Sequence, residues 1–258
     1  GSKYSIIKAM TSIIELTGIT GSGKTTFITK LKKLSKDSNY NIAFVNEYGI
    51  HSISSRYTHK LFFFNNPNDK KSLIRSFLTD LTLLPYFFKT KNLKLSVLFL
   101  KNIFLSKENF FIKLNIFRNF IKKLGMFYKL NRLKVASDLD FIFIDEGSLH
   151  ITHNIFVNEQ IEPNYTHFDE FMSLVPLYDF ILLLSSTKEK LLSVLSKRKH
   201  NRASSDIVSQ NNYISNAMTV FEWILKDNRA NHKIINVDNN SLNSVQNFNS
   251  LITKLSAN

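Results

Sequence analysis

One octapeptide constrains this chain more than any other feature: Gly18-Ile19-Thr20-Gly21-Ser22-Gly23-Lys24-Thr25. It matches G-x-x-x-x-G-K-[ST], a pattern in which glycines let the main chain turn tightly so that successive N–H groups point at phosphate groups. An apolar run at residues 12–17 precedes it, and the residues from about 24 to 34 have a helical pattern. The positive end of that helix dipole would face the same phosphates. The sequence therefore predicts a phosphate-binding loop, or P-loop, between a buried strand and a helix.

The residues of this loop have expected parts in holding a nucleoside triphosphate with Mg²⁺. Lys24 would reach the β- and γ-phosphates and act in catalysis, and the hydroxyl of Thr25 would bind the metal. The motif does not distinguish ATP from GTP. The other residues expected to bind the nucleotide are Gly18, Thr20, Gly21, Ser22, Gly23 and Thr26.

A second acidic motif lies far along the chain, at Phe141-Ile142-Phe143-Ile144-Asp145-Glu146. Four apolar residues followed by a carboxylate are typical of a strand whose terminal aspartate holds Mg²⁺ directly or through water. Ligands of open α/β sheets gather at the carboxyl ends of the strands. We therefore expect Asp145 to be the second metal ligand.

Short apolar runs alternate with helical patterns along most of the chain. The expected strands are residues 12–17, 41–46, 141–144, 180–184 and 233–237, and a last helix is expected at about 242–255. This alternation predicts an α/β fold of the P-loop NTPase type, with a five-stranded, mostly parallel sheet flanked by helices. Residues 3–59 and 135–258 would form this core, and residues 60–134 a helical insertion.

The expected insertion carries most of the chain's excess charge. The net charge of the chain is +14, and residues 60–134 contain sixteen Lys and Arg, three acids and thirteen of the 23 Phe. Three interpretations stay open for this segment: a helical subdomain with a solvated basic face, a lid or acceptor-facing unit that attaches to an anionic membrane surface, or a nucleic-acid-binding unit. Nucleic acid is the least favoured. No uncharged run approaches the ~20 residues that a membrane span requires.

Taken together, these elements resemble the P-loop nucleoside and nucleotide kinases, with thymidylate kinases nearest in layout. The resemblance rests on the P-loop, on Asn46-Glu47-Tyr48-Gly49 after the second strand, on Asp145 and on the basic stretch at 197–202. It implies that Arg198 and Arg202 close over the nucleotide as a lid and neutralise charge that develops on the transferred phosphoryl group.

Two departures from that family bear on the acceptor. Thymidylate kinases usually carry arginines beside both acidic positions, where this chain has Asn46 and Glu146. An acceptor that is already phosphorylated would need those arginines, so we expect an alcohol acceptor such as a sugar or a lipid-linked glycan. Glu146, or else Glu47, would then remove the acceptor proton, and Glu47 and Tyr48 would contact the acceptor. Glu146 could instead position water, or be structural.

The main alternative to a small-molecule kinase is a P-loop NTPase with a regulatory or nucleic-acid-linked role, including polynucleotide kinase. The chain has no cysteine, which fits a reducing cytoplasm. A cytoplasmic location, either free or peripheral on the inner face of the membrane, is therefore expected, and the oligomeric state is left open. His51, His150 and His153 lie near expected strand ends and are expected to be structural, and Glu15 has no assigned role.

Overall fold

The structure of the chain is a computed structural model that describes residues 11–46, 49–53, 83–136, 138–197, 206–238, 242 and 245–256. Residues 83–87 are helical. The named elements, in chain order, are β1 (Ser12–Gly18), α1 (Lys24–Ser35), β2 (Ile42–Asn46), β3 (Gly49–Ile53), α3 (Thr90–Leu105), α4 (Phe110–Ala136), β4 (Phe141–Asp145), α5 (His150–Phe156), α6 (Tyr165–Met172), β5 (Phe180–Leu184), α7 (Lys188–Ser196), α8 (Ile207–Lys226), η1 (Asn231–Lys233), β6 (Ile234–Val237) and α9 (Val245–Ser256).

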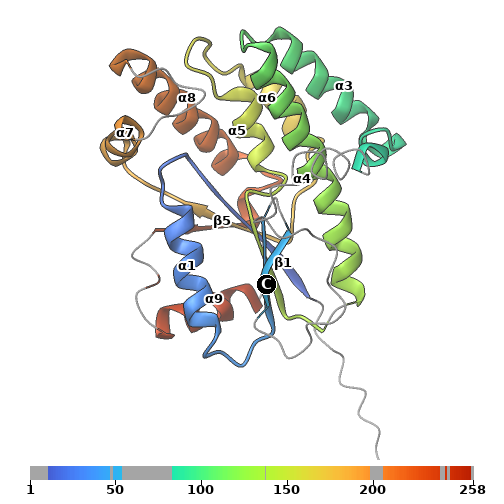
Figure 1. Cartoon of the computed structure of the whole chain (residues 1–258), viewed down its shortest axis with the longest axis vertical. Helices are drawn as coiled ribbons and strands as arrows, with labels where there is room; N and C mark the ends of the chain where they lie inside the picture. The colour runs from blue at the N-terminus through green and yellow to red at the C-terminus, as the bar shows by residue number, and fades with distance from the viewer. Residues whose placement is uncertain are drawn as a thin grey trace, which may run out of the picture.

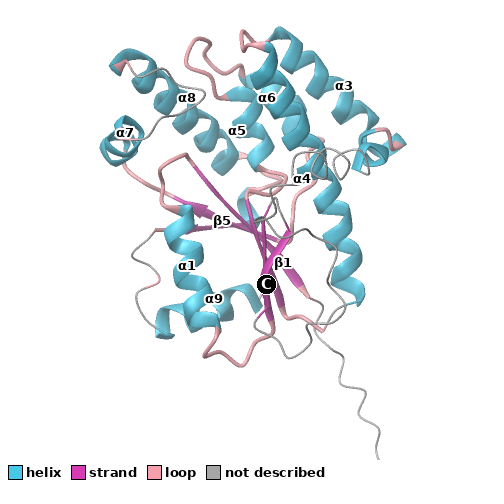
Figure 2. Cartoon of the chain, viewed as in Figure 1, coloured by secondary structure: helices cyan, strands magenta, loops and turns pink. Residues whose placement is uncertain are grey.

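One sheet forms the centre of the molecule (Figure 2). Its strand order is β3-β2-β4-β1-β5-β6. Five of these strands, β2, β4, β1, β5 and β6, pair in parallel with their neighbours. The predicted five-stranded parallel sheet is therefore confirmed. A sixth strand was not predicted: β3 pairs antiparallel with β2 at one edge, where Asn46 lies opposite Gly49.

Helices cover both faces of the sheet (Figure 1). Along β4, Phe141 and Phe143 share one apolar cluster with α1 and α9, and Ile142 and Ile144 share another with α4. This alternation follows from the period of two in a strand, which sends successive side chains to opposite faces. Parallel strands buried on both faces require continuous apolar runs, and those runs are what the sequence contains.

The second half of α4 packs directly on the sheet. Met126 and Leu130 join the cluster that contains Ile142 and Ile144. At the last turn of α4, Lys134 Nζ lies 2.7 Å from Asp179 Oδ1, just before β5, while Asp179 Oδ2 accepts a hydrogen bond from the main-chain N–H of Ile13. The division of the chain into core and insertion stays a prediction, but this part of α4 is integral to the packing of the sheet.

The remaining helices gather beyond the carboxyl edge of the sheet. Figure 1 shows α3, α5, α6 and α8 on the same side as the start of α1. They share one apolar cluster, which also takes Ile181 and Leu183 from β5. Within the described ranges, no helix is long and apolar enough to cross a membrane.

Candidate functional site

The P-loop occupies the turn between β1 and α1, as predicted. Gly21 and Gly23 have φ angles of 91° and 94°, a left-handed region that side chains rarely adopt. A Cβ at Gly21 would also lie 3.2 Å from Val194 Cγ1 on α7. The turn is closed by a 3.0 Å hydrogen bond from the Ser22 N–H to the carbonyl of Ile19. The glycines are therefore needed for the path of the main chain as well as for access to phosphate.

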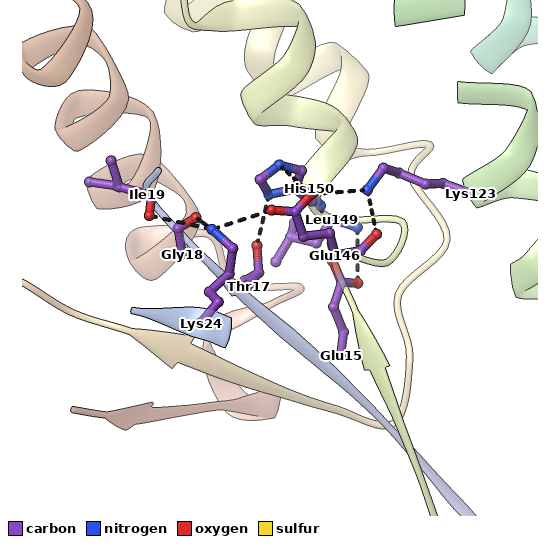
Figure 3. Close-up of polar contacts among 9 residues, drawn as sticks. All are labelled: Glu15, Thr17, Gly18, Ile19, Lys24, Lys123, Glu146, Leu149 and His150. Carbon is purple, nitrogen blue, oxygen red and sulfur yellow. Dashed lines mark hydrogen bonds and ion pairs between the residues drawn. The ribbon is translucent and has the colours of Figure 1, made fainter. Parts of the chain in front are cut away.

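Lys24, the first residue of α1, folds back over the loop that precedes it. Its ammonium donates hydrogen bonds to the carbonyls of Gly18 at 2.8 Å and Ile19 at 3.4 Å (Figure 3). The same Nζ lies 3.3 Å from Glu146 Oε1. The structure thus brings together two residues that are 122 positions apart in the sequence and that the sequence assigned to catalysis.

The two predicted metal ligands line one cavity. It has a volume of about 200 Å³, lies between α1 and the strands β2 and β4, and includes Thr25 and Asp145. Lys32 lines it as well and places its ammonium 5.6 Å from the centre of the Phe44 ring. Burial lowers the pKa of Lys32, and the nearby charge of Asp145 partly offsets this shift.

The donor atoms at this cavity fit Mg²⁺. The ion prefers oxygen ligands and usually keeps several waters, with one or two protein ligands plus substrate phosphates. A hydroxyl at Thr25 and a carboxylate at Asp145 are such ligands. Among the described residues, no group of three or more His, Cys, Asp or Glu could hold a metal ion.

Glu146 lies among three basic side chains. Its carboxylate is near Lys24, lies 3.8 Å from Lys123 Nζ and lies 3.3 Å from His150 Nε2. Burial acts to raise its pKa, but the charges of Lys123 and then Lys24 outweigh burial, so the pKa is lowered. Glu146 is therefore ionised at neutral pH. The 37% of its side chain that is exposed to water also favours the ionised form.

The main chain at Glu146 is also unusual. Its φ is 57°, the only positive φ of a non-glycine residue in the described part of the chain. Such a conformation costs on the order of 1 kcal/mol and is found most often at functional sites. Two hydrogen bonds hold it: the Glu146 N–H donates to the carbonyl of Leu16 at 3.0 Å, and the Glu146 carbonyl accepts from Lys123.

Lys123 is a site residue that the sequence interpretation missed. It is buried on α4 and contacts both the carbonyl and the carboxylate of Glu146 (Figure 3). One signal was present: Ile116, Phe120, Phe127 and Leu130 follow one another at steps of four, seven and three residues, and position 123 divides the step of seven into three and four. A lysine on an apolar stripe needs a partner inside the protein.

Glu15, which had no assigned role, lies directly beneath the loop that follows Asp145. It is fully buried in the middle of β1, and its carboxylate accepts 3.0 Å hydrogen bonds from the N–H groups of Leu149 and His150 at the start of α5. Burial raises its pKa to about 7, against the effect of those two hydrogen bonds. Glu15 thereby fixes the start of the helix that carries His150.

The two buried histidines of α5 stack on each other, with ring centroids 4.9 Å apart. His150 contacts Glu146, and its Nδ1 lies 3.4 Å from Thr17 Oγ1, with the direction of that hydrogen bond set by the tautomer. His153 packs against Tyr213 and Phe221 of α8. His150 is thus close enough to orient Glu146. The side chain of His51 lies outside the described residues.

The other predicted site residues are either partly or fully exposed near the loop or lie outside the described residues. Thr26 is exposed on the first turn of α1, and Thr20 is half-buried in the loop. Glu47 and Tyr48, expected to contact the acceptor, lie outside the described residues, as do the lid arginines Arg198 and Arg202. Their roles stay predictions.

The strand order, the loop between β1 and α1 and the acidic end of β4 define a P-loop α/β protein. No family model matches the chain, and no curated protein matches it. Among solved structures it is similar to deoxyadenosine kinase from M. mycoides, determined with the products dCMP and dCDP bound. The two share 15% sequence identity with a TM-score of 0.42, over 95% of this chain and 100% of the other. At that distance the likeness says nothing about what this chain acts on.

Proposed function

We propose that this chain is an ATP-dependent phosphotransferase, a small-molecule kinase that transfers the γ-phosphoryl group to an alcohol such as a sugar or a lipid-linked glycan. The supporting observation is the 3.3 Å pair between Lys24 and Glu146. In this pair, the cation that we expect to bind phosphate lies beside the ionised carboxylate of Glu146. GTP would fit the same loop, and a binding assay with both nucleotides would establish which one is preferred.

In the proposed reaction, the acceptor oxygen bonds to the γ-phosphorus as the bond from phosphorus to the β–γ bridging oxygen breaks and ADP leaves. The acceptor proton passes to the Glu146 carboxylate. Lys24 and the N–H groups of the P-loop hold the phosphates, and their charge matters most as the phosphoryl group moves. Thr25 and Asp145 would hold Mg²⁺, which supplies charge neutralisation between the β- and γ-phosphates.

The charges around Glu146 suit a base that is activated by its substrate. Without nucleotide, Lys123 and Lys24 lower its pKa, which makes it a weak base. A bound triphosphate would draw Lys24 to its own oxygens and add negative charge nearby. Both changes raise the pKa of a neighbouring carboxylate, bringing it toward the neutral range in which a general base is most effective.

The rival candidate is a P-loop NTPase in which Glu146 positions a water molecule. The same Lys24–Glu146 pair supports it, because a carboxylate beside the γ-phosphate can orient water as readily as an alcohol. The two functions differ in what receives the phosphoryl group. A polynucleotide kinase is a third case, distinguished by labelling of nucleic-acid ends.

The test is a transfer screen with γ-labelled ATP and Mg²⁺ against sugars, nucleosides, glycolipids and oligonucleotides. We expect label on an alcohol acceptor and faster ADP release when that acceptor is present. With the acceptor in hand, Glu146→Gln should bind Mg·ATP normally but transfer phosphate at least ~100-fold more slowly in single-turnover assays. Glu170→Gln, an exposed glutamate on α6, is the matched control and should behave as wild type.

Three outcomes would count against the proposal. Label found only in inorganic phosphate, with no acceptor effect, would favour the NTPase. Transfer at the wild-type rate by Glu146→Gln would remove Glu146 as the base. Loss of Mg·ATP binding in that variant would move Glu146 into the metal site and leave the alcohol-acceptor argument without support.

A further inference from the structure

The turn between α3 and α4 exposes a group of large apolar side chains. Phe104, Phe110 and Phe111 are 75%, 72% and 80% exposed. The ring centroids of Phe110 and Phe111 lie 5.9 Å apart. Leu105 and Leu114 are exposed beside them. We call these five residues the hairpin tip. Exposed groups of apolar side chains of this kind mark interaction surfaces in soluble proteins.

The apolar surface continues from the tip along the outer face of α3. Leu93, Val97 and Phe104 are exposed and recur at steps of four and seven residues, which places them on one side of the helix. The opposite side, with Leu95, Leu98 and Phe99, is buried in the large apolar cluster. The helix α3 is therefore apolar on both sides, although only one side has a partner within the described chain.

The charged residues around this surface are almost all positive. Residues 83–136 contain twelve Lys and Arg and one acid, Glu108. The Glu108 carboxylate accepts a 2.8 Å hydrogen bond from Asn158 Nδ2, which holds it against the body of the protein. On α3, Lys94 and Lys101 are exposed between the apolar residues. A surface that alternates apolar side chains with lysines, and lacks free acids, complements an anionic interface.

We infer that the hairpin tip and the outer face of α3 bind an anionic lipid surface, with the phenylalanines at the level of the acyl chains and the lysines among the headgroups. Four of the seven exposed apolar side chains of this surface are aliphatic. They would gain nothing from stacking on bases, whereas a lipid interface favours Leu, Val and Phe alike. A second copy of the chain would bring the same positive charge to the same face. This inference does not depend on the proposed phosphotransfer.

The position of the hairpin agrees with such a role. The turn between α3 and α4 projects from the end of the molecule that lies beyond the carboxyl edge of the sheet (Figure 1). Lys113, on the first turns of α4, donates a 3.3 Å hydrogen bond to the carbonyl of Phe104, so the two arms of the turn are joined. The tip is thus a preformed projection, with little ordering required on contact.

The experiment measures sedimentation of the full chain with two kinds of vesicle, one of pure phosphatidylcholine and one of equal parts phosphatidylcholine and phosphatidylglycerol. We expect binding to the mixed vesicles only, weakening sharply from low to high salt. The double variant Phe110→Ser/Phe111→Ser should bind at least ~10-fold more weakly. Lys94→Gln/Lys101→Gln should weaken binding roughly 25-fold, about fivefold for each lysine.

Two further variants keep the result interpretable. Ile207→Ser/Val208→Ser removes an equally exposed adjacent pair, 77% and 69% exposed at the start of α8, and should leave vesicle binding unchanged. Phe110→Leu/Phe111→Leu keeps apolar side chains but removes the rings. It should retain lipid binding within about threefold, because interfacial binding follows buried apolar area.

Each of the following results would overturn the inference. The first is that the protein fails to bind mixed vesicles at low salt, or that it binds pure phosphatidylcholine equally well. The serine variant at the tip binds as wild type, or the control pair at α8 weakens binding equally. An oligonucleotide binds in place of lipid, and both the leucine and the serine variants lose it, which would assign the tip to base stacking. Ultracentrifugation shows a dimer that the serine variant dissociates, which would assign the tip to a second copy.

Discussion

The buried ammonium of Lys123 donates a hydrogen bond to the main-chain carbonyl of Glu146. The same Nζ lies 3.8 Å from the Glu146 carboxylate. One lysine therefore neutralises the side chain and holds the left-handed main chain of the residue that we propose as the base. Because Lys123 belongs to α4, the basic middle part of the sequence contributes directly to the candidate site.

Replacing Lys123 with Met keeps the length of the side chain but removes its charge and hydrogen bond. We expect a loss of about 1–3 kcal/mol in the free energy of unfolding, since the buried carbonyl loses its donor. The pKa of Glu146 should rise, because the charge of Lys123 is the largest of the charges that lower it. The acid limb of the transfer rate should then move to higher pH. Urea denaturation and a pH–rate profile measure the two effects.

The neighbouring residue offers the control for that change. Lys122 has the same chemistry but is only half-buried, so Lys122→Met should cost less and leave the pH profile in place. Equal effects of the two substitutions would show that Lys123 acts only through the general charge of α4.

Removal of Lys24 tests the phosphate site. In Lys24→Ala the triphosphate loses a charge-assisted contact of about 1.5–3 kcal/mol, so Mg·ATP binding should weaken roughly 10- to 100-fold and turnover should vanish. Calorimetry measures the affinity, and Lys33→Ala, on the exposed side of the same helix, is the control. Unchanged affinity for both ATP and GTP in Lys24→Ala would rule out the P-loop interpretation.

The buried carboxyl of Glu15 makes stability depend on pH. Its pKa is raised from 4.5 to about 7 in the folded chain. The folded state therefore binds a proton more tightly than the unfolded state, and the stabilisation is complete below pH 4.5 and lost as pH rises to about 7. We expect Glu15 to account for a decline of roughly 3 kcal/mol across that window.

The Glu15→Gln variant should show a flatter profile over the same window, because its amide does not titrate. Urea denaturation at intervals from pH 4.5 to 7.5 measures both proteins. A decline of equal size in the variant would mean that other groups cause it.

The elements that local sequence patterns determine were predicted well. The P-loop needs glycines at fixed spacing, and buried parallel strands need continuous apolar runs, so both are visible without knowledge of the fold. β3 was missed because Gly49-Ile50-His51-Ser52-Ile53 contains no such run, and an edge strand is stabilised mainly by the strand next to it. The pairing of Asp145 with Thr25 in one cavity could be expected from the rule that parallel strands end at one edge.

The contacts that build the rest of the site depend on tertiary packing. Lys123 was one of sixteen basic residues in its segment, and nothing local distinguished it except its place on an apolar stripe. Glu15 is an acid inside an apolar strand, and its partners are N–H groups more than 130 residues away. Such partners are fixed by how helices dock on the sheet, which the sequence pattern does not specify.

Gly147 has no room for a side chain. A Cβ there would lie 2.5 Å from Tyr178 Cε2 and 2.7 Å from Glu15 Oε2. We expect Gly147→Ala to lower the free energy of unfolding by about 1–3 kcal/mol. Adding Glu15→Ala should recover part of that loss, since one of the two obstructing groups is gone, and a double-mutant cycle measures the recovery. If the effects of the two substitutions on the free energy of unfolding are strictly additive, the contact with Tyr178 alone accounts for the destabilisation by Gly147→Ala.

The crowding of Gly147 against Glu15 links two positions that lie 132 residues apart in the chain. Across evolution, a lineage that keeps the acid in the first strand should keep the glycine two places after Asp145, whereas loss of the acid would relax that requirement only in part, because Tyr178 also crowds the glycine. The two positions should therefore vary together in a sequence alignment. This pair, read with the P-loop, forms a diagnostic signature by which distant relatives of this chain could be recognised even where overall identity has decayed.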